Sequence, residues 1–303
     1  MENPLVFLSN ELAAVADRAG RVAVAVHARP RISSSGVLWR DGVVVTAEHT
    51  VRRDEEIRVT LPGGKTVPAT LAGRDPGTDL AVLRVEGPAG AEIATTDSIK
   101  AGNLVLAIGR SEETGVGAAL GVISGVSGPW HTWRGGKIDR YVRLDIGLYP
   151  GASGGAAVDV EGRVVGIVTA GLSRTSVLGI PAATVNRVAD ELLNQGHVAR
   201  GYLGVGLQPI VLPAHLKAKL KTAEGAEGGL IVLSVEPGGP AADAGLVLGD
   251  VLIALDGKPV TDTSDVQDFL STDYVGKPVK ISAIRGGEPA EVTVTIGQRP
   301  RRR

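Results

Sequence analysis

The feature that most constrains the fold is a series of short hydrophobic runs between about residues 21 and 180, separated by Gly, Pro and Asp. Examples are "RVAVAVHA", "GVVVTA", "EIRVTL", "LAVLRV", "NLVLAIG" and "GRVVGIVTA". Strands of this length with turn signals between them are typical of an antiparallel barrel or sandwich. The 42 glycines support a β architecture, because tight turns and close backbone approaches favour a residue without a Cβ.

Helices are predicted at both ends of this region. The opening "MENPLVFLSNELAAVADRAG" is typical of a short amphipathic helix, and it has neither the basic start nor the sustained apolar stretch of a secretory signal. In "PAATVNRVADELLNQG", residues Val185, Val188 and Leu192 recur at helical spacing, and Gly196 gives a stop signal.

A second unit begins at about residue 199. The stretch "ARGYLGVGLQPI" opens a region that mixes strands with two candidate helices, "PAHLKAKLKT" and "TSDVQDFLSTD". Thr263 or Ser264 is the expected N-cap of the second helix, since a hydroxyl there can accept from the first free backbone amides. A length of 303 residues is compatible with two domains.

Composition excludes several classes of protein. The formal net charge of -1 gives no electrostatic reason to expect nucleic acid as a partner, and the closing "RPRRR" is expected to be a solvated basic tail. The absence of Cys excludes disulfides, thiolate zinc sites and a cysteine nucleophile. No segment approaches the roughly 20 apolar residues of a membrane span. The chain as given is therefore expected to be cytoplasmic, or periplasmic or in the cell envelope if a leader has been removed.

Candidate catalytic side chains lie at three predicted strand ends. His49 ends the strand in "GVVVTAEHTV", Asp79 precedes the strand in "DPGTDLAVLRV", and Ser153 lies in "YPGASGG". The small residues around Ser153 allow backbone amides to approach a ligand closely, although a plain Gly-rich turn is also compatible. The chain order His, Asp, Ser is informative, because triads on unrelated folds follow different orders.

The sequence "GASGG" also satisfies the G-x-S-x-G elbow of α/β-hydrolases. That motif requires a helix directly after the serine, with the acid and the histidine further along the chain. Here "AAVDVEGRVVGIV" follows and predicts two strands, while His49 and Asp79 lie upstream. The elbow interpretation fails on this context.

Together these stretches resemble a known family. "TAEHTV", "DPGTDLAVLRV" and "YPGASGGAAVD…GRVVGIVTA" are similar to the three active-site blocks of trypsin-like serine proteases of the HtrA (DegP/DegS-like) family. "GYLGV" and "VEPGGPAADAGLVLGDVLIALDGKPV" resemble that family's PDZ domain. The resemblance covers residues 10 to 298. It implies a mainly β chain with an N-terminal helical segment at 1–20, a chymotrypsin-like double β-barrel at 21–198, an α+β PDZ domain at 199–298 and the tail at 299–303.

The resemblance also implies roles for individual residues. His49 would be the general base, Asp79 the acid that orients it, and Ser153 the nucleophile. The backbone amides of Gly151 and Ser153 would form the oxyanion hole. The implied activity is hydrolysis of peptide bonds in unfolded or damaged proteins without any cofactor. The alternative is a catalytically silent binding or holdase protein on the same fold.

Two positions depart from the family's pattern. Ala152 stands where Asn is usual, which has little effect because the oxyanion hole uses main chain there. Glu48 replaces a usual Asn beside the histidine, and we expect its side chain to point to solvent. A metal site in the cluster of Glu48, His49, Asp54, Glu55 and Glu56 is not expected, since the ligand spacing of known zinc motifs is missing.

The resemblance further locates the substrate sites. The floor of the specificity pocket would come from Gly147, Leu148 and Tyr149, beside Ala152, and its wall from Thr169, Ala170 and Gly171. Without an acidic side chain at the floor, cleavage after small or medium aliphatic residues is predicted, because burying an unpaired cation costs several kcal/mol. Arg174, in the loop after Ala170, is expected to face solvent.

In the PDZ domain a peptide would add as a strand to a sheet edge, with its carboxylate held by backbone amides. The carboxylate loop would be Tyr202, Leu203, Gly204 and Val205, and Val205 and Leu207 would begin the receiving strand. Val266, Phe269 or Leu270 would form the other wall, although an ordinary core position is equally compatible with Phe269. The expected partners are unfolded polypeptides and protein C-termini. The resemblance also implies a homotrimer, with Phe7 in the contact between the subunits.

Two other stretches admit simple interpretations. "GVGAALG" misses the spacing of a nucleotide-binding loop and is predicted to be a loop beside a strand. The aromatics Trp130 and Trp133 in "GPWHTWRGG" predict either an exposed contact surface or partial burial under the barrel rim.

Overall fold

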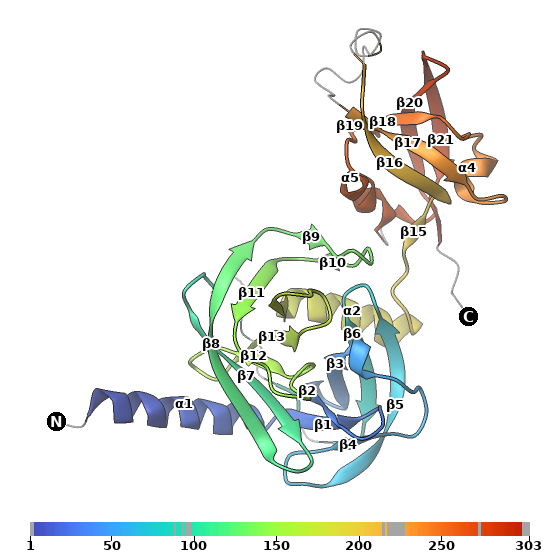
Figure 1. The fold of residues 1–303 in the computed structure, drawn as a ribbon. Helices are drawn as coiled ribbons and strands as arrows, with labels where there is room; N and C mark the ends of the chain where they lie inside the picture. The colour runs from blue at the N-terminus through green and yellow to red at the C-terminus, as the bar shows by residue number, and fades with distance from the viewer. Residues whose placement is uncertain are drawn as a thin grey trace. The chain divides into compact units, whose positions relative to one another are not determined.

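The structure is a computed structural model that describes residues 3–87, 89–91, 94, 99–213, 216, 228–271 and 274–298. The chain divides into two compact units, Met1–Val198 and Ala199–Arg303, which Figure 1 draws with the elements labelled. The candidate helix "PAHLKAKLKT" lies almost wholly outside the described residues, and so does the basic tail.

The first unit begins with a closed barrel of strand order β1-β2-β3-β6-β5-β4. A short turn of 3₁₀ helix, η1 (Glu48–Thr50), directly follows β3. Val24, Val26, Leu38, Val44 and other buried aliphatics fill the barrel interior. The strands are β1 (Ala23–His27), β2 (Ser34–Arg40), β3 (Val43–Ala47), β4 (Ile57–Thr60), β5 (Thr66–Asp75) and β6 (Leu80–Val85).

A second closed barrel follows with strand order β11-β14-β13-β12-β7-β8. Its strands are β7 (Leu104–Ser111), β8 (Gly115–Ser127), β11 (Tyr141–Asp145), β12 (Ala156–Val158), β13 (Val164–Thr169) and β14 (Val177–Pro181). A small hairpin of β9 (Trp130–His131) and β10 (Lys137–Ile138) stands between β8 and β11. The expectation of a loop at "GVGAALG" was wrong, since these residues begin β8 and pair along β7.

The two barrels pack against each other through a continuous hydrophobic core. Trp39, Val45 and Leu80 of the first barrel share this core with Ile108 and Ile167 of the second. Each fully buried aliphatic side chain of this kind contributes about 1.5–3 kcal/mol to the free energy of unfolding. The candidate catalytic groups lie along the seam between the two barrels. They belong to the first residues after β3, the turn before β6 and the loop that leads into β12.

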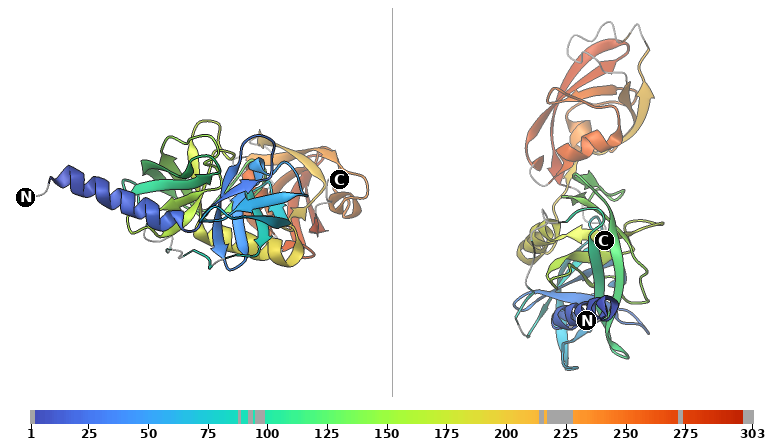
Figure 2. Two further views of the ribbon diagram at one scale, coloured as in Figure 1. Left: turned by 90° about the horizontal axis from the view of Figure 1, so that it is seen from below. Right: turned by 90° about the vertical axis from the view of Figure 1, so that its left-hand side faces the viewer.

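Two helices flank the barrels as the sequence predicts. Helix α1 (Pro4–Gly20) packs through Val15 and Ala19, and its N-terminal half extends away from the barrels (Figure 2). Helix α2 (Ala182–Gln195) ends at Gly196, whose φ of 74° is the left-handed conformation that glycine adopts without strain. Within the described ranges, no helix combines the length and hydrophobicity needed to cross a membrane.

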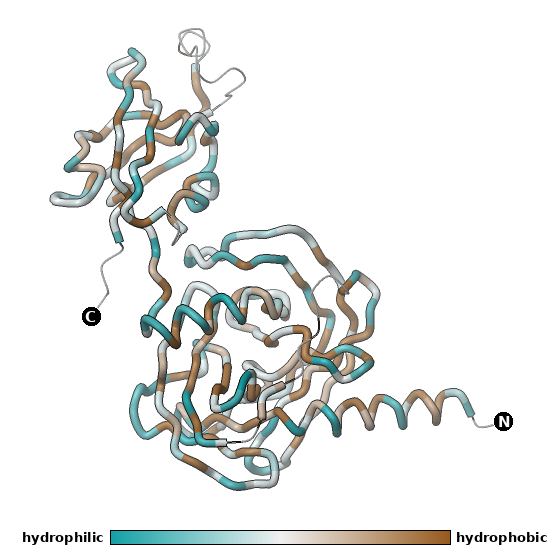
Figure 3. The backbone as a smooth tube through the Cα atoms, turned by 180° about the vertical axis from the view of Figure 1, so that it is seen from behind, coloured by the Kyte–Doolittle hydropathy of each residue, from teal (hydrophilic) through white to brown (hydrophobic). Residues whose placement is uncertain are grey.

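The second unit is built on a sheet of order β16-β17-β18-β20-β21, in which β16 is an edge strand. The strands are β15 (Gly201–Tyr202), β16 (Val205–Val211), β17 (Gly228–Val235), β18 (Val251–Leu255), β19 (Lys258–Pro259), β20 (Pro278–Arg285), β21 (Glu288–Thr295) and β22 (Gly297–Gln298). The helical elements are α4 (Pro240–Asp243), α5 (Thr263–Gln267) and η3 (Asp268–Leu270). Figure 3 shows hydrophobic residues recurring along the strands of both units.

The predicted N-cap of α5 was wrong. Asp262 caps the helix instead, because its carboxylate accepts from the Ser264 amide at 2.8 Å. Asp265 reciprocates by accepting from the Asp262 amide at 2.9 Å. This capping box uses two carboxylates, which accept more strongly than the hydroxyls of Thr263 or Ser264.

Candidate active site

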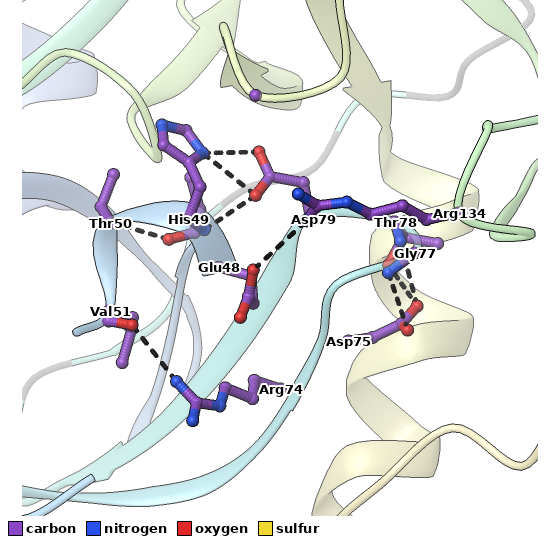
Figure 4. A network of polar contacts seen from close by, with 12 residues as sticks. Glu48, His49, Thr50, Val51, Arg74, Asp75, Gly77, Thr78, Asp79 and Arg134 are labelled. Carbon is purple, nitrogen blue, oxygen red and sulfur yellow. Dashed lines mark hydrogen bonds and ion pairs between the residues drawn. The ribbon is translucent and has the colours of Figure 1, made fainter. Parts of the chain in front are cut away.

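His49 and Asp79 form a close pair at the end of the first barrel (Figure 4). His49 Nδ1 lies 2.8 Å from Asp79 Oδ2 and 3.0 Å from Oδ1. The backbone amide of His49 also donates to Asp79 Oδ1 at 2.9 Å. The Asp79 carboxylate is buried whereas the imidazole is partly exposed, so the ring is fixed on one edge and free on the other.

The turn that carries Asp79 is fixed by its own hydrogen bonds. The Asp75 carboxylate accepts from the amides of Gly77 and Thr78, each at 3.1 Å. Asp79 itself has a φ of 58°, an unusual conformation for a residue with a Cβ and one that Asp tolerates better than most. The Thr132 hydroxyl, from the β9–β10 hairpin, donates to the Gly77 carbonyl at 2.7 Å. The hairpin therefore supports the turn beneath the acid.

Glu48 does not point to solvent, and the expectation that it would was wrong. Its side chain is only 13% exposed, and Oε2 lies 4.0 Å from Nη1 of Arg134 on the β9–β10 hairpin (Figure 4). Burial, together with the nearby negative charge of Asp79, raises the pKa of the Glu48 carboxyl. The η1 turn directs this side chain beneath the hairpin instead of outward.

Ser153 lies on the loop between β11 and β12, which packs directly against the first barrel. Gly154 has a φ of 89°, and a Cβ there would lie 2.5 Å from the Thr46 hydroxyl and 2.8 Å from the Ala47 amide. Only glycine therefore allows the loop to touch β3 immediately before His49. Further back, the Tyr149 hydroxyl donates to the Gly117 carbonyl at 2.9 Å and ties the loop to β8.

The three residues at the end of β13 connect the three candidate catalytic groups. The Thr169 hydroxyl donates to Asp79 Oδ2. The Ala170 amide lies 3.4 Å from Ser153 Oγ. A Cβ on Gly171 would lie 2.5 Å from both His49 Nδ1 and Asp79 Oδ2. One short segment therefore contacts His49, Asp79 and Ser153, and it brings them into one site.

The candidate oxyanion donors have no competing partner. Within the described part of the chain, the amides of Gly151 and Ser153 donate to no protein acceptor, whereas the intervening Ala152 amide donates to the Tyr149 carbonyl at 3.0 Å. Ser153 Oγ and His49 likewise share no hydrogen bond there. Catalytic hydrogen bonds of this kind often tighten only when substrate binds.

The predicted pocket residues divide into two groups. Gly147 is exposed, with open space where a Cβ would stand, and Leu148 packs against the core of the second barrel. Thr169 is completely buried and bonded to Asp79, so its side chain supports the acid and does not form a pocket wall. Arg174 is exposed, as expected. No cluster of three metal-ligating side chains occurs among the residues described.

The predicted peptide loop of the second unit also presents free amides. The carbonyls of Leu203 and Gly204 accept from the amides of Ala241 at 2.9 Å and Glu236 at 2.8 Å. In the described part of this unit, the amides of Leu203 and Gly204 have no protein acceptor. Val205 and Leu207 lie on the edge strand β16 and are partly buried. Phe269 is only 2% exposed and belongs to the core, which favours the core interpretation of this residue.

Several supporting residues were missed by the sequence interpretation. Thr169 was assigned to a pocket wall, and Ser35, Thr46 and Arg134 were not singled out. The side chains of Thr169, Ser35 and Arg134 reach partners far along the chain, such as Asp79 at 90 residues from Thr169. Neither hydrophobic periodicity nor turn composition carries information on such long-range pairs. The run "SSSG" at residues 33–36, where β2 begins, was a local hint of polar side chains in a buried strand.

Comparison with known proteins identifies both units of the chain. Residues 34–167 match a trypsin-like peptidase domain, and residues 201–296 match a PDZ domain. A periplasmic serine endoprotease, DegP-like, of Brucella suis biovar 1 is 34% identical over 284 residues, covering 90% of this chain and 54% of that protein. The HhoB serine protease of Synechocystis sp. is 31% identical over 286 residues, covering 89% and 68%. The chain thus spans about half the length of the DegP-like relatives that it matches.

Solved structures give the same result. The HtrA-type protease AlgW with a decapeptide has a TM-score of 0.77 and 26% identity, over 96% of this chain and 99% of that one. The serine endoprotease from Yersinia pestis has a TM-score of 0.75 and 28% identity, over 95% and 98%. These matches confirm the predicted mainly β architecture of two barrels followed by a PDZ domain. The chain belongs to the HtrA/DegP-like family of trypsin-like serine proteases with a PDZ domain C-terminal to the protease domain.

Proposed function

We propose that the chain is a serine endopeptidase that hydrolyses peptide bonds in unfolded polypeptides through Ser153, His49 and Asp79. The observation that carries the proposal is the segment 169–171, which contacts an acid, an imidazole and a hydroxyl drawn from three distant parts of the sequence. Structural packing alone does not require these three functional groups to meet at one strand end. Acyl transfer does require them.

In the proposed reaction, Ser153 Oγ attacks the substrate carbonyl carbon while His49 Nε2 accepts the hydroxyl proton. Asp79 bonds to Nδ1 at 2.8 Å, which fixes the ring tautomer and stabilises the imidazolium that forms. The tetrahedral intermediate then expels the amine, to which His49 returns the proton. This leaves an acyl group on Ser153 and frees the C-terminal part of the substrate.

A water molecule completes the cycle. His49 accepts its proton as the oxygen attacks the acyl carbon, and the second tetrahedral intermediate collapses to a carboxylic acid and regenerated Ser153. In both halves the negative oxygen accepts from the amides of Gly151 and Ser153, which have no protein acceptor of their own in the described chain. Each such donor is worth about 2.7–4 kcal/mol in the transition state of a comparable enzyme.

A covalent probe tests this proposal against the silent holdase alternative. A fluorophosphonate should label the wild-type protein at Ser153 and fail to label Ser153→Ala, and only the wild type should degrade unfolded casein. A wild-type protein that binds casein without labelling or cleavage would favour the holdase. Casein degradation by purified Ser153→Ala would reject the assignment of the nucleophile.

Cleavage after small or medium aliphatic residues is the proposed specificity. Gly147 carries no charge, leaves open space at its Cβ position, and adjoins the apolar Leu148. An aliphatic side chain gains about 1.5–3 kcal/mol from burial, whereas an unpaired Lys or Arg is penalised. Mass spectrometry of fragments from a denatured substrate measures this directly. A majority of cuts after Arg or Lys would exclude Gly147 and Leu148 as the pocket floor.

The PDZ domain is proposed to bind protein C-termini. The free amides of Leu203 and Gly204 supply donors for a carboxylate, and the open edge of β16 can accept a peptide as an added strand. The related AlgW structure contains a decapeptide, which supports a peptide ligand. Calorimetric titration should show binding of a peptide with a free C-terminal carboxylate. Equal affinity for the same peptide with an amidated C-terminus would reject the carboxylate loop.

A periplasmic or cell-envelope location is proposed, because the name of the Brucella relative supports it.

A homotrimer is proposed from the family relationship. Helix α1 has exposed apolar side chains at its N-terminal end, including Leu5 and Phe7. Such a surface gains free energy when a second copy covers it. Light scattering at micromolar concentration should give three times the chain mass. A monomer mass would rule out the trimer.

A further inference from the structure

The start of β2 packs against the loop that carries the nucleophile. Both the backbone amide and the hydroxyl of Ser35 donate to the carbonyl oxygen of Gly151, each at 2.8 Å. Ser35 is completely buried and lies 116 residues from Gly151 in the sequence. One carbonyl of the candidate oxyanion loop is therefore held by two donors from the opposite barrel.

Ser35 is itself fixed on all sides. Its hydroxyl accepts from the Arg110 amide at 3.1 Å, so the hydroxyl proton is directed to Gly151. Its carbonyl accepts from the buried Thr46 hydroxyl at 2.6 Å. Gly109 leaves the space for this arrangement, because a Cβ there would collide with the Ser35 hydroxyl. Rotation of the Ser35 side chain would break two hydrogen bonds in a site without solvent.

The Gly151 carbonyl belongs to the peptide unit between the two candidate oxyanion donors. The Gly151 amide precedes this unit and the Ser153 amide follows it. Gly151 has a φ of 89°, a region in which glycine moves without a steric barrier from a side chain. If the carbonyl were released, the 151–152 peptide could rotate and change the direction of both amides.

We propose that Ser35 is a positioning residue that keeps the Gly151 and Ser153 amides aimed at the oxyanion by holding the Gly151 carbonyl. Ser35 does not touch substrate. It acts through the loop, by setting the direction of the two amides that donate to the negatively charged substrate oxygen. This inference rests on the proposed endopeptidase activity and adds a residue that controls its transition state.

Ser35→Ala removes one of the two donors and keeps the other, because the backbone amide remains. Ser34→Ala is a matched control, since the Ser34 hydroxyl is equally buried but has no hydrogen-bond partner in the described chain. For hydrolysis of a fluorogenic peptide, we expect kcat to fall about 10- to 100-fold in Ser35→Ala, less than the loss on deleting an oxyanion donor itself. KM should change by less than about twofold, because the substrate carbonyl in the ground state carries little charge. Ser34→Ala should match the wild type in both parameters.

A transition-state analogue separates positioning from a merely structural effect. A peptidyl boronic acid places a negative oxygen in the oxyanion hole, so its affinity should fall in Ser35→Ala by the same factor as kcat. The affinity of the corresponding peptide with a neutral C-terminal amide, which puts no negative oxygen in the site, should not change. Ser35→Cys keeps a donor at this position, although a weaker one on a larger atom, and should lie between Ser35→Ala and the wild type. Its kcat and boronate affinity also test the proposal if Ser35→Ala fails to fold.

The outcomes are distinguishable from those of the proposed function. An active wild type together with Ser35→Ala that matches Ser34→Ala in kcat and boronate affinity would overturn this inference alone. Equal losses of boronate and peptide-amide affinity would also overturn it, since they indicate a general disturbance of the site. A wild-type protein unreactive toward fluorophosphonate and peptide would overturn the proposed function and the inference together.

Discussion

The two halves of the candidate active site are fixed in place in different ways. In the first barrel, His49 and Asp79 are oriented by side-chain hydrogen bonds, and the turn beneath Asp79 is closed by Asp75, Thr78 and Thr132. In the second barrel, Ser153 lies on a loop of small residues that packs its backbone against the first barrel, with Gly154 against β2 and β3 and the Gly151 carbonyl bonded to Ser35. The first half depends on a buried charge and its donors, and the second depends mainly on the absence of Cβ atoms.

This difference predicts which substitutions each half of the site tolerates. The acid–base half is sensitive to the loss of a polar atom, because its buried carboxylate needs its donors. The nucleophile half is sensitive to added volume at its glycines, and it is also sensitive to loss of the Ser35 hydroxyl that holds the Gly151 carbonyl. The segment 169–171 belongs to both halves, because it supplies a hydroxyl to Asp79 and a glycine beside the imidazole.

The largest expected effect is on the reacting groups themselves. Ser153→Ala or His49→Ala should reduce kcat by about a million-fold, since triad members act as a unit. Asp79→Asn should cost about 10⁴-fold, because it favours the wrong tautomer of the ring. The unfolding midpoint of Ser153→Ala should stay close to that of the wild type, as the hydroxyl makes only one hydrogen bond to the described part of the chain. A Ser153→Ala protein that unfolds would give the hydroxyl a structural role instead.

Gly171→Ala tests whether added volume breaks the link between the halves. The new methyl would stand 2.5 Å from His49 Nδ1 and Asp79 Oδ2, so one partner must move by about 1 Å. A displacement of that size costs on the order of 100-fold in kcat. Gly128→Ala is the control, because nothing lies within 4 Å of its Cβ position. Equal kcat values for Gly171→Ala and Gly128→Ala would mean that Gly171 does not lie against the His49–Asp79 pair in solution.

Thr169→Val asks the complementary question about polarity. Valine keeps the shape of threonine and removes the hydroxyl that donates to Asp79. Loss of one hydrogen bond to a charged group costs about 1.5–3 kcal/mol, and we expect a decrease in kcat of roughly 10-fold or more. Thr132→Val removes a hydroxyl that supports the turn but does not touch Asp79, and it should cost less. A larger loss of kcat in Thr132→Val than in Thr169→Val would mean that the turn, and not β13, holds Asp79 in place.

The smallest expected effect concerns Glu48. Its pKa is raised from the ordinary 4.5, first by burial and then by Asp79, while Arg74, Arg134 and His49 oppose the shift. The protonated form is therefore favoured on folding. The stability that Glu48 contributes is complete below the unfolded pKa and is lost as pH rises through the folded pKa.

Glu48→Gln should consequently be more stable than the wild type at neutral pH, with the difference shrinking toward pH 4. The kcat of Glu48→Gln should differ from that of the wild type by less than about threefold, since the Glu48 side chain pairs with neither Asp79 nor Ser153. Unfolding midpoints over a range of pH and kcat values of both proteins measure this. A stability difference that grows on acidification would contradict the burial of an ionised Glu48.

Much of the fold could be predicted because hydrophobic runs and turn residues are local signals. The runs at "GVVVTA" and "LAVLRV" gave strands, and the spacing of Val185, Val188 and Leu192 gave a helix that ends at Gly196 as expected. The loop predicted at "GVGAALG" failed for a tertiary reason. Its glycines lie in a strand that accommodates the Tyr149 ring, since a Cβ on Gly117 would come within 2.7 Å of that ring.

The candidate triad could be predicted from chain order and resemblance, but its support could not. Glu48 was expected in solvent because nothing local shows that a hairpin 86 residues further along supplies Arg134. Ser35 and Thr169 owe their importance to partners across the seam between the barrels. Such contacts depend on the packing of two closed sheets, which a single sequence does not specify residue by residue.

The most direct test of the account is the structure of the protein with a peptidyl boronic acid bound. The account predicts a bond from Ser153 Oγ to boron, with one boronate oxygen within about 2.7–3.1 Å of the Gly151 and Ser153 amides. It also predicts that Ser35 still donates twice to the Gly151 carbonyl and that His49 still pairs with Asp79. A boronate bound elsewhere, or bound to Ser153 with its oxygen facing solvent and the Gly151 carbonyl turned away from Ser35, would contradict it.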